Sequence, residues 1–363
     1  MFLSYLNNFN IRQCKAQYLW VYYLQMSKLN PDNVIYIINK DYLEDYSNEE
    51  HRWEKKYLTT SRTSKKYLLM EEPKNIGKSP SEFLKSYVRE HQNSIEHYLV
   101  NNVNFDNIDA IITWVNNNTL KSYANSNNIS IIHNECGPLR SPVYLDTFYF
   151  DFSGVNGSTE FNSRFEEFLK ISNKLKLFSR EELLEIVSPD YYKELIEVLH
   201  NKNGSNTGFP SQVMNDTNVL VYNNGWTLID VLEYTNNKHN NMMIRNHPSS
   251  NFTFNKEIYY TSLHEHCYEF INECSKIITL NSSVGFEALL LDKYVEFLGE
   301  SPFSNIPYYD EDIQLKALNF AIISYLIPNN CLFNEDYYKF RLTCFDEEKL
   351  YNKGLELWKV DKF

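Results

Sequence analysis

The sequence has few of the features that mark secreted or membrane-spanning proteins. Its six cysteines are scattered over 363 residues and form no CxxC pair. A disulfide scaffold is short and dense in cysteine, so we expect reduced thiols in a cytoplasmic protein. No stretch reaches about 18 uninterrupted apolar residues, and a membrane span is not expected. The first residues lack a basic segment followed by a long apolar run, so no signal peptide is expected either.

Positive charge is also in deficit. The chain has 35 Lys and Arg against 47 Asp and Glu, a formal net charge of −12. An acidic surface repels phosphate backbones, so we expect no nucleic-acid partner. A peripheral membrane contact would need a local aromatic or basic patch. Gln17–Leu29 is the candidate for one, and a buried helix face is the favoured alternative for the same stretch.

Several common signatures are missing. The sequence contains no GxGxxG, no Walker loop and no GxSxG. It therefore gives no support to a dinucleotide-binding protein, a P-loop NTPase or an α/β hydrolase. His264, His266 and Cys267 are metal-binding residue types, but residues two apart do not share a helix face. We therefore expect no metal and no cofactor.

What is present indicates an α/β protein. Hydrophobic residues make up 43% of the chain, enough for a real core, and the length suits two domains. In the first half, Asn33–Asn39, Asp109–Val115 and Ile129–His133 read as strands, and Asn118–Asn127 reads as a helix. This order predicts a right-handed parallel βαβ unit. Ser163–Leu199 reads as helical.

The second half repeats the alternation after Asn201–Gly208, the most loop-like stretch, where we expect a domain boundary between 1–205 and 206–363. The strands expected there are Val219–Tyr222, Asn241–Asn246, Lys276–Leu280 and Tyr294–Phe297; the helices are Thr227–Thr235, Tyr259–Ser275 and Val284–Leu291. Two parallel-sheet domains facing across a cleft are the natural architecture. Ligands of such sheets bind at the carboxyl ends of the strands.

The clearest motif is TLNSSVGFEALLL, at 279–291. Ser282 and Ser283 stand between a strand and a helix, where free N–H groups and the helix dipole favour an anion such as phosphate. Gly285 allows a close backbone approach, and Glu287 is a candidate acceptor for ribose hydroxyls. The alternative is that the serine is merely an N-cap.

Two further motifs flank this one in sequence. Arg245-Asn246-His247-Pro248 ends a strand, where His247 is able to donate a hydrogen bond or proton to a leaving phosphate. The segment GFPSQVMND ends at Asp216, a candidate nucleophile or base. A loop histidine and a turn aspartate are the structural alternatives, and Asp230 competes with Asp216 for the same role.

The fourth motif is NECGPLRSPVYLDTFYFD, at 134–151. Glu135 follows a strand end, and Arg140 is suited to bidentate pairing with a substrate carboxylate. Asp146 and Asp151 are further acids in the same segment. The alternative is a Gly-Pro turn carrying solvated charges.

Taken in this order, the four motifs resemble those of the bacterial retaining β-Kdo transferases of capsule and lipopolysaccharide biosynthesis. More distantly, they resemble bacterial sialyltransferases with His-Pro and Ser-Ser motifs. The matching pieces are ECGPLRSP around Glu135, QVMND from Gln212 to Asp216, RNHP at 245–248 and SSVGFEALL at 282–290.

The resemblance implies a GT-B fold of two Rossmann-like domains, with the acceptor on 1–205 and CMP-Kdo on 206–363, the last helices packing back on the first domain. It implies Asp216 as nucleophile and Glu135 as acid/base, with His247 and the serine turn on the CMP phosphate. Gln212, Arg245, Pro248 and Gly285 belong to the same motifs and are counted with the CMP-binding residues. Arg140 as a ligand of the sugar carboxylate is an inference from charge alone.

The implied partners are a CMP-activated sugar donor and a glycan or lipid-linked glycan acceptor. Contact with the inner face of the membrane or with a capsule assembly complex would follow from a lipid-linked acceptor. Two alternatives stay open from the sequence. One is an inverting CMP-sialic acid transferase, in which a carboxylate acts as general base. The other is a non-catalytic protein that binds the nucleotide sugar within an assembly complex.

Overall fold

A computed structural model describes residues 1–6, 21, 24–25, 27–39, 66–70, 78–248, 250, 254–255 and 257–360. The stretch Gln17–Leu29 lies largely outside these residues. Within them, no helix is long and apolar enough to cross a membrane, and the five described cysteines are all free thiols.

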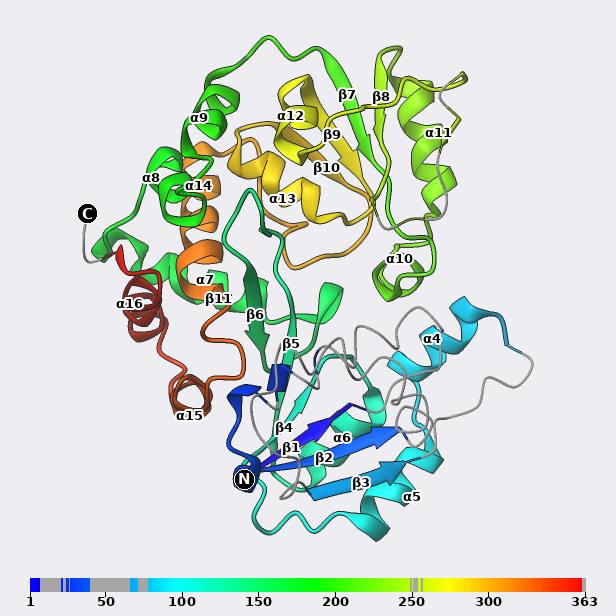
Figure 1. Ribbon diagram of the computed structural model, residues 1–363, viewed down its shortest axis with the longest axis vertical. Coiled ribbons are helices and arrows are strands. Elements are labelled where there is room, and N and C mark those ends of the chain that lie inside the picture. The colour runs from blue at the N-terminus through cyan, green and yellow to red at the C-terminus, as the bar shows by residue number, and fades with distance from the viewer. Residues whose placement is uncertain are drawn as a thin grey trace. The chain divides into compact units, whose positions relative to one another are not determined.

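The chain forms two compact units, and it passes between them more than once (Figure 1). The first unit consists of Met1–Glu135, Phe150–Val155 and Asn330–Phe345. The second consists of Cys136–Tyr149, Asn156–Asn329 and Asp346–Phe363. The division expected between 205 and 206 therefore falls inside the second unit, where it marks the start of that unit's parallel sheet.

The first unit is built on five parallel strands in the order β5-β4-β1-β2-β3. Their bounds are β1 Phe2–Tyr5, β2 Val34–Asn39, β3 Lys66–Met70, β4 Ala110–Thr113 and β5 Ser130–Cys136. Its helices are η1 Pro31–Asn33, α4 Pro80–Arg89, α5 Asn93–Asn102, α6 Asn118–Ser126 and α15 Glu335–Thr343. The succession β4, α6, β5 confirms the parallel βαβ arrangement predicted from the sequence.

The second unit is built on four parallel strands in the order β10-β9-β7-β8. Their bounds are β7 Asn206–Pro210, β8 Met242–Arg245, β9 Cys274–Thr279 and β10 Tyr294–Phe297. The helices α10 Thr217–Val221, α11 Leu228–Lys238, α12 Cys267–Asn272 and α13 Ser283–Leu290 alternate with them. Helices α12 and α13 pack against β9 and β10 (Figure 1).

The rest of the second unit is mainly helical. It comprises η2 Asn156–Ser158, α7 Phe161–Ile171, η3 Ser172–Lys174, α8 Arg180–Val187, α9 Tyr192–His200, α14 Glu311–Asn319, the π-helix η4 Phe320–Tyr325 and α16 Glu347–Leu357. Strand β11, Leu326–Pro328, pairs antiparallel with the start of β6, Thr147–Asp151. The expected α/β class with two parallel sheets is thus confirmed.

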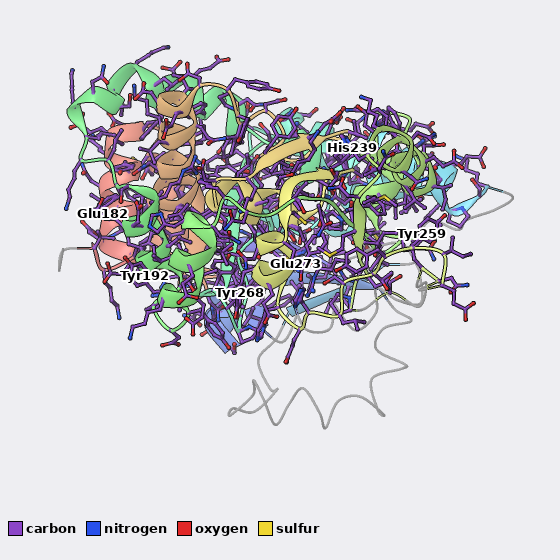
Figure 2. The ribbon with its side chains drawn as sticks, turned by 90° about the horizontal axis from the view of Figure 1, so that it is seen from above. Glu182, Tyr192, His239, Tyr259, Tyr268 and Glu273 are labelled. Carbon is purple, nitrogen blue, oxygen red and sulfur yellow. The ribbon has the colours of Figure 1, made fainter. Side chains whose placement is uncertain are left out.

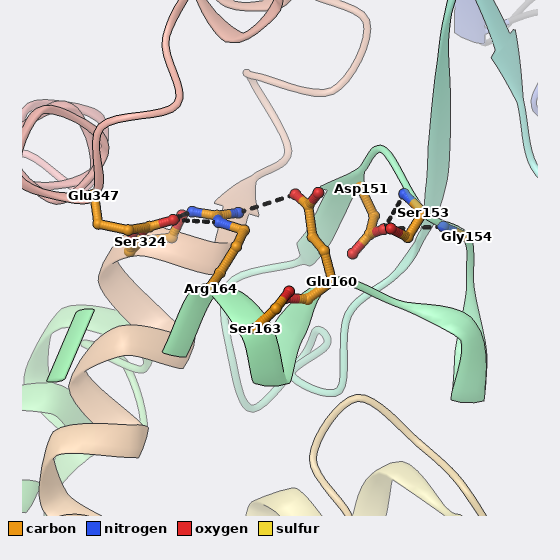
Figure 3. Close-up of polar contacts among 8 residues, drawn as sticks. All are labelled: Asp151, Ser153, Gly154, Glu160, Ser163, Arg164, Ser324 and Glu347. Atoms are coloured by element: carbon orange, nitrogen blue, oxygen red, sulfur yellow. Dashed lines mark hydrogen bonds and ion pairs between the residues drawn. The ribbon is translucent and has the colours of Figure 1, made fainter. Parts of the chain in front are cut away.

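Buried arginines explain why the helices between 156 and 205 belong to the second unit. Arg164 of α7 is 8% exposed and donates to both carboxylate oxygens of Glu347 in α16, at 2.6 and 3.1 Å (Figure 3). Arg180 of α8 donates to the carbonyl oxygen of Leu289 at 2.7 Å. A buried charge left without its partner is costly, so these contacts tie α7 to α16 and α8 to α13 within the second unit.

Three expected elements of the second unit are wrong in whole or in part. Val219–Tyr222 was expected as a strand and lies in helix α10, because a four-residue apolar run does not distinguish the two. Asn201–Gly208 was expected as a loop, yet β7 begins at Asn206. Gly208 suits that strand because a Cβ there would lie 2.6 Å from Ile277 Cδ1. The helix expected over Tyr259–Ser275 is confined to α12.

Candidate functional site

The site residues of the second unit gather where its parallel strands end. Ser211 follows β7, His247 follows β8 and Ser282 follows β9. The first two ends are joined directly, because the backbone N–H of His247 donates to Ser211 Oγ at 2.9 Å and that of Ser211 donates to Arg245 O at 2.9 Å. This is the edge where open parallel sheets bind ligands.

Asp216 caps the short helix α10. Its Oδ1 accepts a hydrogen bond from the backbone N–H of Asn218 at 2.8 Å. The side chain is open to water, yet it stands among enough protein atoms for partial exclusion of water to raise the pKa of its carboxyl. The Asn218 N–H and the charges of Arg140 and His247 act in the opposite direction. An acid so surrounded is a candidate for chemistry as well as a cap.

Arg140 and His247 lie near enough to Asp216 for their charges to act on its carboxyl. Arg140 is exposed, and its Nε donates to Gly137 O at 3.1 Å. Partial burial and the charge of Arg140 lower the pKa of His247, which Asp216 opposes. At neutral pH His247 is therefore mainly an uncharged imidazole, suited to donating a hydrogen bond from one ring nitrogen.

The turn at Ser282 and Ser283 caps helix α13, which is the structural alternative to phosphate binding. Ser282 is the N-cap of α13, and its Oγ accepts from the backbone N–H of Val284 at 3.3 Å. Ser283 is the first residue of the helix. Capping does not compete with anion binding, because other N–H groups of the first turn stay available. Gly285 serves packing, since a Cβ there would lie 2.4 Å from Phe297 Cζ.

Glu287 sits deeper than the sequence suggested. It is 8% exposed, and burial raises its pKa to about 7, against the opposing effects of Arg245, Arg140 and a hydrogen bond with Cys267. Tyr144 is close enough for Glu287 to raise the pKa of its phenol as well. The result is a buried carboxyl that is partly protonated at neutral pH.

The remaining motif residues have structural partners. Arg245 donates from both terminal nitrogens to the carbonyl oxygens of His264 and Glu265, each at 2.8 Å. Gln212 Nε2 donates to Asn281 Oδ1 at 2.9 Å. Pro248 is exposed and follows His247 directly. Their contact with a nucleotide stays a prediction.

Glu135 lies near the end of β5, in the first unit. The indole Nε1–H of Trp114, which is 4% exposed, donates to its Oε1 at 3.1 Å. The neighbouring acids serve turns. Asp151 accepts from the backbone N–H groups of Ser153 and Gly154 at 2.7 and 2.9 Å (Figure 3). Asp146 accepts from the backbone N–H of Ser141 at 2.9 Å.

The competing aspartate, Asp230, has a purely local role. It is the third residue of α11 and accepts from both the backbone N–H and the hydroxyl of Thr227, each at 2.7 Å. This is a capping box on an exposed helix end. Asp216, not Asp230, therefore lies with Arg140 and His247.

The run His264-Glu265-His266-Cys267 divides its side chains among different neighbours. His264 bonds to Glu273, and His266 stacks on Tyr268 at 5.7 Å between ring centroids; Figure 2 labels both partners. Within the part of the chain that the structure describes, no group of three His, Cys, Asp or Glu residues is arranged to hold a metal ion.

Asn281 was not singled out from the sequence, although it stands inside the serine motif. It is 2% exposed and makes side-chain hydrogen bonds to three separate segments of the second unit. A buried amide directly before two serines at a strand end was the one available signal.

Two family models match the chain. Residues 65–160 match "Glycosyltransferase 99 family N-terminal domain", and residues 172–307 match "Capsule polysaccharide biosynthesis protein". The two matches cover the segments that carry Glu135 and Arg140, and those that carry Asp216, His247 and Ser282, respectively. Among curated proteins, none matches this chain.

Solved structures with a similar course of the chain include two from Thermosulfurimonas dismutans. KpsC, beta Kdo 2,7 transferase, is 15% identical with a TM-score of 0.40, over 81% of this chain and 92% of that one. KpsC, beta Kdo 2,4 transferase, is 13% identical with a TM-score of 0.43, over 62% and 82%. UDP-GlcNAc 2-epimerase from Neisseria meningitidis is 10% identical with a TM-score of 0.28, over 99% and 98%.

Proposed function

We propose that the protein transfers Kdo from CMP-Kdo to a glycan acceptor, because residues 172–307 match a capsule polysaccharide biosynthesis family and residues 65–160 match a glycosyltransferase 99 N-terminal domain. The second unit would bind the donor and the first unit the acceptor. The product would be part of a surface polysaccharide, with the acceptor a glycan or a lipid-linked glycan.

The observation that carries the proposal is the charge at the end of the second sheet. In a chain of net charge −12, the cations Arg140 and Arg245 gather there with the imidazole of His247 around two carboxyls whose pKa values are raised. CMP-Kdo carries two negative charges, one on its phosphodiester and one on the sugar carboxylate. A region richer in cationic groups than in ionised carboxylates suits such a donor.

Each charge on the donor has a proposed partner. The exposed guanidinium of Arg140 would pair with the sugar carboxylate, since its fork geometry matches a carboxylate bidentately. His247 and the first turn of α13, at Ser282 and Ser283, would hold the phosphate. Glu287, partly protonated at neutral pH, would accept one hydrogen bond from a ribose hydroxyl and donate another.

We propose double displacement with retention. Asp216 attacks the anomeric carbon while the bond from that carbon to the phosphate oxygen breaks, and CMP leaves with the electron pair. A hydroxyl of the acceptor then attacks the glycosyl ester, its proton passes to Glu135, and Asp216 is released as a carboxylate. Arg140 and His247 support the ionised form of Asp216 that the first step requires.

The test is intact-protein mass spectrometry after mixing with freshly made CMP-Kdo and no acceptor. We expect an adduct of one Kdo that peptide mapping assigns to Asp216. Asp216→Ala should abolish adduct and transfer while keeping CMP affinity. Asp230→Ala is the matched control, because it removes a helix cap from the same unit and should transfer normally.

The other outcomes contradict the proposal at different levels. No adduct, with a product of inverted configuration, would exclude the covalent mechanism and favour an inverting transferase of the sialyltransferase kind. CMP binding without any turnover would favour a non-catalytic binding partner. Neither CMP binding nor turnover would remove the proposed donor altogether.

A further inference from the structure

The helix that carries Asp216 is too short to hold itself in place. α10 has five residues, and isolated helices shorter than about 12 residues are marginal in water. The last carbonyls of any helix also lack partners within it. The position of Asp216 therefore depends on groups outside α10, and the structure identifies the main one as the side chain of Asn281.

Asn281 bonds to both ends of α10. Its Nδ2 donates to the carbonyl oxygen of Asn218, the second residue of the helix, at 2.9 Å, and to that of Tyr222, the C-cap, at 3.0 Å. Glu300 O, just beyond β10, lies 3.3 Å from the same nitrogen. Tyr222 O also accepts from the backbone N–H of Glu300 at 2.8 Å, which ties the end of α10 to the segment after β10.

Asn281 also holds the loop that enters α10. Its Oδ1 accepts from Gln212 Nε2 at 2.9 Å, and its backbone N–H lies 3.4 Å from Gln212 Oε1. Asp216 stands between these two anchors, four residues after Gln212 and two before Asn218. One side chain therefore constrains the candidate nucleophile from both directions along the chain.

The next residue after Asn281 is Ser282, the N-cap of the proposed phosphate turn. One buried residue, Asn281, thus links the segment that carries the proposed nucleophile Asp216 to the turn that would bind the phosphate. We propose that Asn281 is a positioning residue that aligns Asp216 with the bound donor. This inference rests on the proposed function of the site, but its structural part does not.

Asn281→Asp is the sharpest variant because it keeps size and the acceptor for Gln212. It replaces the Nδ2 donor with an oxygen that repels the carbonyls of Asn218 and Tyr222. We expect kcat to fall on the order of 10- to 100-fold, the usual effect of a misplaced reacting group. The KM for CMP-Kdo and the affinity for CMP should stay within about 3-fold, since ground-state binding is not the function lost.

A second readout does not depend on turnover. Hydrogen–deuterium exchange of residues 212–222 should quicken at least about 10-fold in Asn281→Asp and in Asn281→Ala, while α16 keeps its protection. If Asn281→Asp fails to fold, loss of protection in α16 will reveal it, and Asn281→Ala carries the test. Asn237→Ala, at an exposed asparagine on α11, is the matched control and should change neither readout.

The two proposals fail in different ways. If the wild-type protein does not turn over CMP-Kdo, the proposed function is wrong, and exchange at 212–222 still decides whether Asn281 holds α10. Unchanged exchange there, in a folded variant, would overturn the role of Asn281. Faster exchange with unchanged kcat in an active enzyme would show that Asn281 orders α10 without aligning Asp216, and would overturn the proposal too.

Discussion

The carboxyl ends of the two sheets present different chemistry. In the first unit, Glu135 is held by the indole of Trp114, and that ring packs on Phe333 with 6.1 Å between centroids. In the second unit, two arginines and a histidine act on the carboxyls of Asp216 and Glu287. The first arrangement suits an uncharged ligand and the second an anionic one.

This contrast indicates how the work would be divided. A carboxylate held by a buried indole N–H is suited to receiving the proton of a sugar hydroxyl. Two guanidinium groups and a neutral imidazole around carboxyls with raised pKa values are suited to binding and releasing a charged leaving group. This division is wrong if a substitution in one unit has the effect that we expect of a substitution in the other unit. Each variant below tests for that outcome.

The largest effect is expected from His247→Ala. Loss of the hydrogen bond to the departing phosphate should slow CMP release in a single turnover on the order of 100-fold. Equilibrium affinity for CMP should change much less, because the bond strengthens as the leaving group gains charge. Rapid-quench measurement of CMP release gives the rate. His200→Ala is the control, since His200 is exposed. An unchanged rate in His247→Ala would mean that His247 is a loop residue with no part in CMP release.

Glu287 tests the electrostatics without turnover. Its pKa is about 7 in the folded protein against 4.5 ordinarily, so the folded state holds this proton more tightly than the unfolded chain. The stability it contributes is complete below about pH 4.5 and is lost as the pH rises through about 7. The amide of Glu287→Gln does not titrate. As the pH rises across that range, the free energy of unfolding of this variant should therefore increase by about 3 kcal/mol relative to that of the wild type.

Denaturant unfolding at a series of pH values measures this gain. Glu265→Gln is the control, because it makes the same substitution at an exposed glutamate. Parallel curves for wild type and Glu287→Gln from pH 5 to about 8 would mean that burial does not hold a proton on this carboxyl.

Much of this arrangement was predictable from the sequence. The strands containing Ile131, Ile244 and Ile278 are recognisable as apolar runs, and the candidate residues Glu135, His247 and Ser282 stand at or just beyond their ends. The proximity of Arg140 to Asp216 was not predicted, because the sequence indicated Arg140 only as a ligand of a substrate carboxylate. What these predictions used was local: an apolar run, a strand end and the residues just beyond it.

The failures have a common cause in tertiary packing. β7 contains Gly208 and Pro210, which are typical of loops. The side chains of Ile277, Cys274 and Phe270, which a Cβ at position 208 would meet, explain the glycine. α10 reads as a strand because its partner, Asn281, lies 59 residues beyond Tyr222. The depth of Glu287 likewise depends on Cys267 and Tyr144, which no local pattern connects to it.

A smaller effect is expected from Arg140→Ala. The KM for CMP-Kdo should rise about 10-fold through loss of a charge-assisted contact, whereas the affinity for CMP, which lacks the sugar carboxylate, should hardly change. Arg140→Lys should recover only part of the loss, since a lysine does not form the bidentate pair. Calorimetric titration with CMP beside steady-state kinetics separates the two quantities. An equal loss for both ligands would move Arg140 from the sugar to the nucleotide.

The smallest effect, and the one that tests the first unit, is expected from Trp114→Phe. An aromatic ring is kept beside Phe333, while part of the indole and its N–H donor to Glu135 are lost. Loss of the donor costs about 1 kcal/mol, or roughly 5-fold in kcat/KM for the acceptor. Trp226→Phe, the same change at a partly buried ring of the second unit, is the control. If Trp114→Phe weakens CMP binding instead, the donor depends on the surroundings of Glu135 in the first unit. The proposed division between a unit for the neutral acceptor and a unit for the anionic donor would then be wrong.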